Sequence, residues 1–394
     1  MPDDTQQSTD SRLTHLRIII VIGVLDLGGS ERQALTLAQY LRNVAGADVE
    51  ICGCGPAQGR VAQLCNELRI PWRLISLPWK REWGRVRRTV ALIKFARDLR
   101  RARPDVLLPY ISLMDVFCGL VWKFTGARSC IWSQREALIS QPVGPRKELL
   151  AAQRTPWFTS NSQHGADFLI NKLNVSPDRV QVVRNAIQLP AAESDRATWR
   201  RKLGLRDEEF VAVMIANLHP LKDHATLLRA WQIVTSHRPA TLLLAGRDDG
   251  LENALKLQAF DLGLSAQVKF LGAVEDIAGL LSAGDLGVLS SPSEGSPNGI
   301  LECMSAGLPV VGTDVPGIRE AVGAEGSSFL APAKDAETLA AKILTLADNE
   351  TLRRELGDLN RRRIQTTFSV RKLGEDTTSV ILKSLGPAAG LKQT

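Results

Sequence analysis

The sequence predicts an α/β protein made of two doubly wound domains that face each other across a cleft. Two blocks of the chain each alternate short apolar runs with helical patterns, which is typical of parallel strands joined by crossover helices. A polar stretch over 185–194 separates the blocks. The 394 residues fit two or three domains of roughly 150 residues each, and an apolar fraction of 44% suffices for buried cores.

The first block begins at Arg17, and we assign residues 17–188 to its domain. Helical patterns cover 30–42, 59–68 and the long stretch 83–103. We also expect the helix near 370–385 to pack back onto this domain. Apolar, β-branched runs predict strands over 17–24, 48–52, 72–77, 106–109, 129–133, 157–160 and 180–183.

The second block restarts at Phe210, after a predicted helix over 195–203, and we assign 205–368 to its domain. Predicted strands cover 210–216, 240–245, 268–271, 285–290 and 309–313. Predicted helices cover 224–236, 251–262, 277–283 and 300–306, and helices fill most of 336–385. Both domains are therefore Rossmann-like, and ligands are expected on the loops at the carboxyl ends of the strands.

Charge and apolar patterning exclude several classes of protein. No apolar run approaches the roughly 20 residues that cross a bilayer, and residues 1–11 lack the basic start and apolar centre of a signal peptide. We therefore expect a cytoplasmic protein. The six cysteines lack metal-type spacing and no Asp-x-Asp pair occurs, so we expect neither a metal nor another cofactor.

The most informative segment runs from Ser290 to Val311, where a strand enters a loop of Ser, Pro and Gly and a helix begins near Asn298. The backbone N–H groups of Gly299 and Ile300, together with the helix dipole, form a site suited to a diphosphate. Glu294 in the loop and Glu302 on the helix can accept hydrogen bonds from sugar or ribose hydroxyls. In the alternative interpretation, Glu294 is a solvated loop residue and Glu302 a partner of the helix dipole.

The run Glu294-Gly-Ser-Pro-Asn-Gly-Ile-Leu-Glu302 closely resembles the E-x7-E signature of family 4 retaining glycosyltransferases, which have the two-domain GT-B fold. Asp26-Leu-Gly-Gly-Ser-Glu-Arg32 resembles the N-terminal glycine loop of that family, and Asn217-Leu-His-Pro-Leu-Lys222 resembles its basic diphosphate motif. Residues 159–162 and 183–187 resemble positions near the domain junction. The resemblance spans the chain from Arg17 to about Leu385.

The resemblance implies a nucleotide-diphosphate sugar donor bound mainly by the second domain and a hydroxyl acceptor bound mainly by the first. By motif position, Glu302 would hold the donor ribose and Glu294 the donor sugar. Lys222 would bind the diphosphate and stabilise the charge of the departing group. The further contacts that it implies are Gly28, Gly29, Asn298, Gly299 and Ile300 at the diphosphate, Val274 and Asp276 near the base, and Arg135 and Glu136 on the acceptor side.

Three departures from the family pattern bear on this prediction. Asn217 stands where the family often has an arginine, and Arg247 either replaces that cation or is a surface turn residue. The loop 132–136 has no match to the acceptor-side histidine frequent in the family. His219 and His224 flank Lys222 and either serve the site or cap and solvate the helix start.

The stretch from Lys80 to Arg103 contains ten basic residues and two acidic ones. On its predicted helix, Val86, Val90 and Ile93 form an apolar stripe that Leu92, Ala96 and Leu99 widen, with cations on a neighbouring face. Either the helix over 83–103 lies on an anionic membrane surface, or it packs on the sheet with a solvated cationic back. No nucleic-acid motif accompanies the charge, so we expect no nucleic-acid partner.

We therefore predict a cytoplasmic retaining glycosyltransferase, peripheral on the inner face of the membrane, whose acceptor is a lipid-linked or cell-surface glycan. A nucleotide-sugar epimerase of the same fold and a non-catalytic glycan or nucleotide-sugar binding protein stay open as alternatives. A dehydrogenase fits poorly, because residues 23–28 lack the G-x-G-x-x-G spacing.

Overall fold

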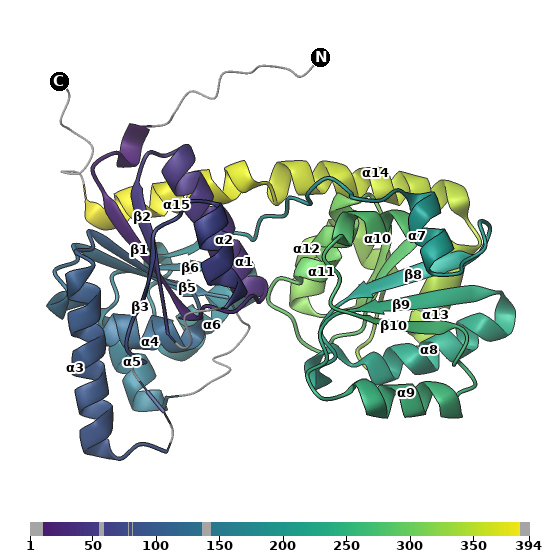
Figure 1. Ribbon diagram of the computed structural model, residues 1–394, viewed down its shortest axis with the longest axis horizontal. Coiled ribbons are helices and arrows are strands. Elements are labelled where there is room, and N and C mark those ends of the chain that lie inside the picture. Colours follow the sequence, from purple (N-terminus) through teal and green to yellow (C-terminus); the bar gives the residue numbers. More distant parts are fainter. Residues whose placement is uncertain (1–10, 55–58, 78, 81, 136–142, 387–394) are drawn as a thin grey trace. The chain divides into compact units, whose positions relative to one another are not determined.

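The computed structural model describes residues 11–54, 59–77, 79–80, 82–135 and 143–386 (Figure 1). The chain divides into two compact units. Unit 1 runs through Ala186 and resumes at Val370, and unit 2 comprises Ile187–Ser369. Each unit is a parallel sheet with interleaved helices, so the predicted Rossmann-like α/β fold class is confirmed. The cleft predicted between the two domains stays a prediction.

Within its described residues, unit 1 contains a seven-stranded parallel sheet with the order β3-β2-β1-β4-β5-β6-β7. Its strands are β1 (Arg17–Val24), β2 (Asp48–Cys54), β3 (Trp72–Leu74), β4 (Val106–Pro109), β5 (Ser129–Gln134), β6 (Trp157–Ser160) and β7 (Val180–Val182). Its helices are α1 (Gly29–Asn43), α2 (Arg60–Glu67), α3 (Arg85–Arg101), α4 (Ser112–Val121), α5 (Pro145–Arg154), α6 (Gln163–Leu173) and α15 (Val370–Leu385). Short 3₁₀ helices cover Ser11–Leu13, Trp122–Phe124 (η2) and Pro177–Arg179.

Strand β1 shows how the sequence builds two cores on one sheet. Its side chains alternate between the two faces, as in any strand. Ile18, Ile20 and Ile22 join one buried cluster, which also contains residues of α1 and α15. Ile19 and Val21 join the other, with residues of α3, α4 and α5. Because both faces are covered, the strand reads as a continuous apolar run.

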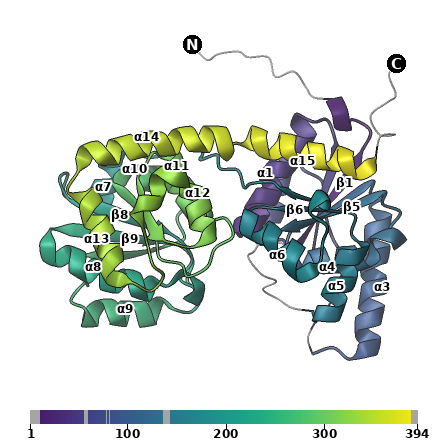
Figure 2. The ribbon, with the colours of Figure 1, turned by 180° about the vertical axis from the view of Figure 1, so that it is seen from behind.

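Helix α15 belongs to unit 1, although it is separated from the rest of that unit by the whole of unit 2. It lies beside α1 (Figures 1 and 2). Gly374 permits this approach, because a Cβ atom there would lie 2.1 Å from the ring of Tyr40. Val380 and Ile381 are fully buried in the same core as β1.

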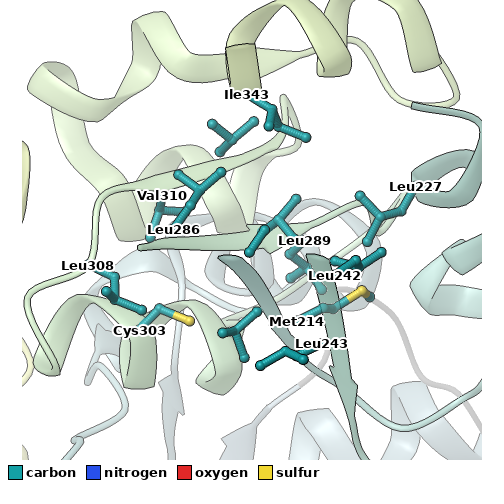
Figure 3. Close-up of a cluster of buried hydrophobic side chains, with 14 of the residues drawn as sticks. Met214, Leu227, Leu242, Leu243, Leu286, Leu289, Cys303, Leu308, Val310 and Ile343 are labelled. Atoms are coloured by element: carbon teal, nitrogen blue, oxygen red, sulfur yellow. The ribbon is translucent and has the colours of Figure 1, made fainter. Parts of the chain in front are cut away.

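In the part of unit 2 that is described, six parallel strands have the order β10-β9-β8-β11-β12-β13. They are β8 (Phe210–Ile215), β9 (Ala240–Ala245), β10 (Val268–Gly272), β11 (Leu286–Leu289), β12 (Val310–Thr313) and β13 (Leu330–Ala331). The helices are α7 (Arg196–Lys202), α8 (His224–His237), α9 (Glu252–Asp261), α10 (Ile277–Ala283), α11 (Asn298–Ser305), α12 (Pro316–Gly326), α13 (Ala336–Ala347) and α14 (Glu350–Thr367). The 3₁₀ helices are η4 (Pro220–Lys222) and Ser327–Phe329. Figure 3 shows strand and helix side chains meeting in the core, among them Met214, Leu289, Cys303 and Ile343.

Four helices were not predicted, namely α4, α5, α6 and α12. Helix α4 shows why, because eight of its ten residues are buried, including Met114, Asp115 and Phe117. A helix buried on nearly every side has no polar face, so its sequence lacks the period that marks a surface helix. The strand predicted over 72–77 ends at Leu74, and α7, which we placed between the domains, belongs to unit 2.

The apolar stripe described for the helix over 83–103 packs on unit 1 only in part. Ala91, Phe95 and Leu99 are the buried residues of α3, whereas Val86, Val90 and Ile93 are exposed. The buried row has a strict four-residue spacing, and its large member is the aromatic Phe95. None of the helices in the described ranges is long and apolar enough to span a membrane.

Candidate functional site at the carboxyl edges of the sheets

In unit 2 the strand order reverses between β8 and β11. The chain continues from β8 to β9 and β10 on one side, and from β11 to β12 and β13 on the other. The loops that leave β8 and β11 therefore diverge, and such a switch point is where open α/β sheets bind ligands. The two motifs that resemble a donor site follow these two strands, so the topology brings them together.

The backbone around Lys222 is fixed from two sides. His219 caps η4, because its Nδ1 accepts a hydrogen bond from the Leu221 N–H at 3.2 Å. From the end of β11, the Ser290 hydroxyl lies 3.0 Å from the Lys222 carbonyl oxygen and 2.9 Å from that of Asp223, and it can donate to either. Asp223 has a φ of +47° and caps α8 through the Thr226 N–H. The backbone at Lys222 is therefore fixed, and this limits the positions that its ammonium group can reach.

Lys222 and Glu294 form an ion pair across the switch point, with 2.5 Å between Nζ and Oε1. The Ser291 hydroxyl donates to the same Oε1 at 2.6 Å. The side chain of Lys222 is 29% exposed and that of Glu294 is 10% exposed. Partial burial strengthens the interaction while leaving the ammonium accessible. The arrangement offers a cation for a phosphate beside a carboxylate for a sugar hydroxyl.

Helix α11 begins against the end of β8. A Cβ atom on Gly299 would lie 2.1 Å from the carbonyl oxygen of Ile215, so only glycine allows this close approach. Pro297 is the N-terminal cap of the helix and forms no side-chain cap hydrogen bond. Asn298 and Gly299 are half-buried and Ile300 is buried. The first turn of α11 therefore places backbone donors and the positive end of a helix dipole at the switch point.

Glu302 lies one turn into α11 and is 4% exposed. Its neighbours Leu301 and Cys303 are also buried, and burial together with the charge of Glu302 raises the pKa of Cys303. The structure thus places Glu302 inside unit 2, on the same helix whose first turn faces the switch point. Its contact with a ribose stays a prediction.

Asn217 and Arg247 lie together at the carboxyl ends of β8 and β9. The Asn217 Oδ1 accepts from the Arg247 N–H at 3.2 Å, and its Nδ2 donates to Asp249 at 3.3 Å. The Arg247 guanidinium pairs with Asp249 at 2.8 Å. A cation therefore stands one strand from Lys222, beside the residue that replaces the arginine frequent in the family.

Asp276, which we predicted near the donor base, forms several hydrogen bonds within unit 2. It caps α10 through the Gly279 N–H, and it accepts from the backbone of Glu193 and Ser194 and from Nε1 of Trp199. These four donors occupy both carboxylate oxygens, so the side chain tethers the segment before α7 to α10. Its contact with the donor base stays a prediction. Val274 is half-buried and packs on the core of unit 2.

His224, the first residue of α8, is buried, and neither ring nitrogen has a hydrogen-bond partner in the described part of the chain. Burial lowers its pKa to about 4, and the neighbouring charge of Lys222 acts in the same direction. His224 is therefore neutral near pH 7 and belongs to the packing beneath the site.

The carboxyl edge of unit 1 has a different composition. Gly28 is the N-terminal cap of α1 with no side-chain cap of its own, and Gly29 is the first helical residue. Arg135, which follows β5, is buried, and its guanidinium lies 4.0 Å from the ring centre of Tyr110. It donates to the Asn185 Oδ1 at 3.0 Å, and Asn161 donates to its carbonyl oxygen at 3.0 Å. The segments 159–162 and 183–187 thus converge on Arg135.

Burial raises the pKa of Tyr110, so the phenol beside Arg135 stays neutral. Arg135 was predicted on the acceptor side, and the structure makes it a cation held at the edge of the unit 1 sheet. Glu136 lies outside the described residues.

Sequence reasoning missed three residues that support the unit 2 site. Ser290 and Ser291 fix Lys222 and Glu294, and their position directly after a strand was the available signal. Gly317, in the first turn of α12, lets that helix pack on the Glu294 loop, because a Cβ atom there would lie 2.4 Å from the Glu294 carbonyl oxygen.

Two Rossmann-like units with a charged switch point in the second define the architecture of GT-B glycosyltransferases. The profile of the family described as Glycosyl transferases group 1 matches residues 195–363, and that of Glycosyltransferase Family 4 matches residues 27–189. The chain belongs to the group 1 glycosyltransferases of family 4.

Two curated relatives align with part of the chain. N-acetyl-alpha-D-glucosaminyl L-malate synthase of Bacillus anthracis is 29% identical over 210 residues, which are 52% of this chain and 55% of the relative. UDP-Gal:alpha-D-GlcNAc-diphosphoundecaprenol alpha-1,3-galactosyltransferase of Escherichia coli is 28% identical over 211 residues, 52% of this chain and 54% of the relative. The chain thus spans about half the length of the curated relatives it matches.

Solved structures resemble the whole chain. Anabaena HepE in complex with UDP-glucose has a TM-score of 0.80 at 20% identity, covering 94% of this chain and 100% of that one. The apo lipopolysaccharide outer core galactosyltransferase WaaB has a TM-score of 0.71 at 14% identity, covering 93% and 99%. At these identities the likeness shows the fold alone.

Proposed function

We propose that this protein transfers a sugar from a nucleotide-diphosphate donor to a hydroxyl acceptor with retention of anomeric configuration. The observation that carries this proposal is the Lys222–Glu294 pair at the switch point of unit 2, beside the first turn of α11, whose cap residue is Pro297. A diphosphate needs fixed positive charge and backbone donors, and a sugar needs a carboxylate acceptor nearby. The loops after β8 and β11 supply both.

In the proposed reaction the bond between the sugar C1 and the phosphate oxygen breaks, and a bond from C1 to the acceptor oxygen forms on the same face. The acceptor proton passes to the departing phosphate oxygen, so no protein nucleophile is needed. Lys222 and the N-terminus of α11 stabilise the negative charge that develops on the diphosphate. Glu294 positions the sugar. Glu302 holds the ribose from the next turn of α11.

We further propose that the acceptor is a lipid-linked glycan at the inner face of the membrane. The name of the Escherichia coli relative specifies a diphosphoundecaprenol-linked acceptor, which supports this class. Several names among the relatives and solved structures specify UDP or a UDP sugar, which makes UDP sugars the first donors to test. Unit 1, with Arg135 at its edge, is the proposed acceptor side.

The proposed transfer is independent of a metal ion, because Lys222 and α11 supply the positive charge at the diphosphate. Sugar transfer should then be unchanged after treatment with EDTA. Loss of transfer in EDTA that Mg²⁺ restores would contradict this point.

The decisive experiment combines donor identification with two variants. A panel of nucleotide sugars is screened by thermal shift, because a donor that binds tightly raises the melting temperature by mass action. Glu294→Gln and Lys222→Ala should each lower kcat for transfer by about 10²- to 10³-fold, as the loss of one transition-state contact does. The matched controls are Glu252→Gln and Lys256→Ala, which break an exposed ion pair of the same residue types on α9 and should leave kcat unchanged.

Unchanged transfer in the Glu294 and Lys222 variants would refute the assignment of the site. Isomerised sugar from donor alone would identify an epimerase instead. Donor binding without release of nucleoside diphosphate, under every acceptor tried, would identify a binding protein.

A further inference from the structure

Unit 1 carries an apolar groove outside the site described above. It lies between α3, the end of α4, η2 and α5, and the helices α3, α4 and α5 are neighbours in both views (Figures 1 and 2). Its volume is about 910 Å³, within the usual range for ligand pockets. We call it the α3 groove. The apolar side chains that line it include Leu92, Ile93, Phe117, Leu120, Phe124 and Leu150.

The apolar lining continues onto the open surface of α3 and η2. Val86 is 78% exposed, Ile93 is 56% exposed and Phe124 is 67% exposed. These side chains do not contribute to the core, because α3 packs on unit 1 through Ala91, Phe95 and Leu99. Exposing such large apolar groups to water is unfavourable, so a contiguous apolar surface of this kind marks an interaction site.

Six cationic side chains share the lining of the groove with these apolar residues. Among the described residues that line the groove, none is an aspartate or a glutamate. The cationic lining residues are Arg85, Arg88, Arg97, Arg100, Lys147 and Arg154. A partner must therefore present both apolar groups and negative charge.

Trp79, which also lines the groove, lies close to two of these cations. The guanidinium of Arg88 lies 3.8 Å from the Trp79 ring centre, and the ammonium of Lys147 lies 4.0 Å from it. Burial lowers the pKa of Lys147, and the like charge of Arg88 lowers it further.

The chemistry of the groove favours an anionic amphiphile over other ligands. Nucleic acid or free phosphate would meet the cations but leave Ile93 and Phe124 in water. An acidic phospholipid satisfies both, because its hydrocarbon covers the apolar floor and its phosphate meets the cationic rim.

We propose that the α3 groove docks this protein on a bilayer that contains acidic phospholipid. Val86, Ile93 and Phe124 enter the interface between headgroups and hydrocarbon, while the rim arginines contact lipid phosphates. The use of this surface in catalysis rests on the proposed lipid-linked acceptor. Lipid binding itself requires neither donor nor acceptor, so the two proposals can fail separately.

The test is co-sedimentation of the full chain with vesicles, without donor. The chain should bind vesicles of phosphatidylglycerol and phosphatidylcholine, bind pure phosphatidylcholine far more weakly, and lose binding as salt increases. The double variant Arg97→Gln/Arg100→Gln should bind the acidic vesicles about 10- to 30-fold more weakly. The double variant Ile93→Ser/Phe124→Ser should also bind them at least about tenfold more weakly, since it removes buried apolar area.

Matched controls exist in unit 2. Arg354→Gln/Arg362→Gln removes two exposed arginines of α14, and Leu257→Ser/Phe260→Ser removes two apolar side chains of α9 that are 62% and 69% exposed. Both control variants should bind vesicles like the unaltered chain. The thermal shift with donor should persist in the groove variants and be lost in Lys222→Ala, which separates docking from the proposed function.

Equal binding to neutral and acidic vesicles would overturn the proposal. So would equal losses in the groove variants and the controls. If the chain sediments without vesicles and the groove substitutions abolish this sedimentation, the surface binds a second copy of the chain instead.

Discussion

The two units share a sheet topology, yet their switch points differ in chemistry. In unit 2 the loops after β8 and β11 bring a lysine and a glutamate together, both partly exposed. In unit 1 the loop after β1 offers Gly28 and Gly29, and the charged Arg135 follows β5, one strand away from the switch point, and is buried. Topology thus selects the place, whereas the loop residues decide what that place can bind.

The difference extends to how the charged groups are held. Arg135 is enclosed by Tyr110 and Asn185, so its interactions lie within unit 1. Lys222 has a carboxylate partner but keeps almost a third of its side chain in contact with solvent. A ligand can compete for the ammonium of Lys222, and Ser290 keeps the Lys222 backbone in place while it does so.

The largest expected effect concerns His224, a buried titratable group that supports only the unit 2 site. Its pKa is about 4 when folded and about 6.5 when unfolded, so the unfolded chain takes up the proton first as the pH falls. The stability of unit 2 should be insensitive to His224 above about pH 6.5. It should fall by on the order of 3 kcal/mol as the pH falls from there to about 4.

The free energy of unfolding in urea is measured between pH 7 and 4.5 for the unaltered chain and for His224→Leu. The difference between the two pH profiles gives the contribution of His224. His237→Leu is the control, because His237 is exposed on the same helix and its loss should keep the original profile. Parallel profiles for the chain and for His224→Leu would contradict the prediction.

The next prediction compares the loss of stability caused by substituting a glycine at each of the two switch points. Gly299→Ala should destabilise unit 2 by about 1–3 kcal/mol, because the added Cβ meets the backbone oxygen of Ile215. Gly28→Ala should change stability by less than about 0.5 kcal/mol, because its Cβ meets only the flexible carboxylate of Glu31. The melting temperatures of both variants check this prediction. Equal decreases in melting temperature for Gly299→Ala and Gly28→Ala would contradict it.

The smallest effect tests whether Arg247 replaces the cation absent at Asn217. Arg247→Gln should weaken donor binding by about 3- to 10-fold, since a partly exposed charge contributes about 1 kcal/mol. Arg319→Gln is the matched control, because Arg319 is equally exposed and also pairs with an aspartate, Asp314, two strands from β8. Donor titration should separate the two variants, and equal affinities would assign Arg247 to the surface turn.

The sequence allowed most of the strand segments along the chain and the position of the E-x7-E loop to be predicted, because parallel strands and glycine-rich turns leave local patterns. Helix α4 escaped prediction because burial on nearly all sides removes its polar face. The contacts of Ser290 with the Lys222 turn join residues 67 and 68 positions apart, and no local pattern specifies them. The partners of Asp276 could not be predicted for the same reason, since two of them come from the distant segment before α7.

The place of α15 bears on how the chain folds during synthesis. Ile381 and Val380 complete the core beneath α1, yet the ribosome makes them after the whole of unit 2. Unit 2 can therefore finish folding while the α1 side of unit 1 still lacks its last helix. A nascent or truncated chain without α15 would expose that apolar side and would be prone to aggregate until the helix arrives.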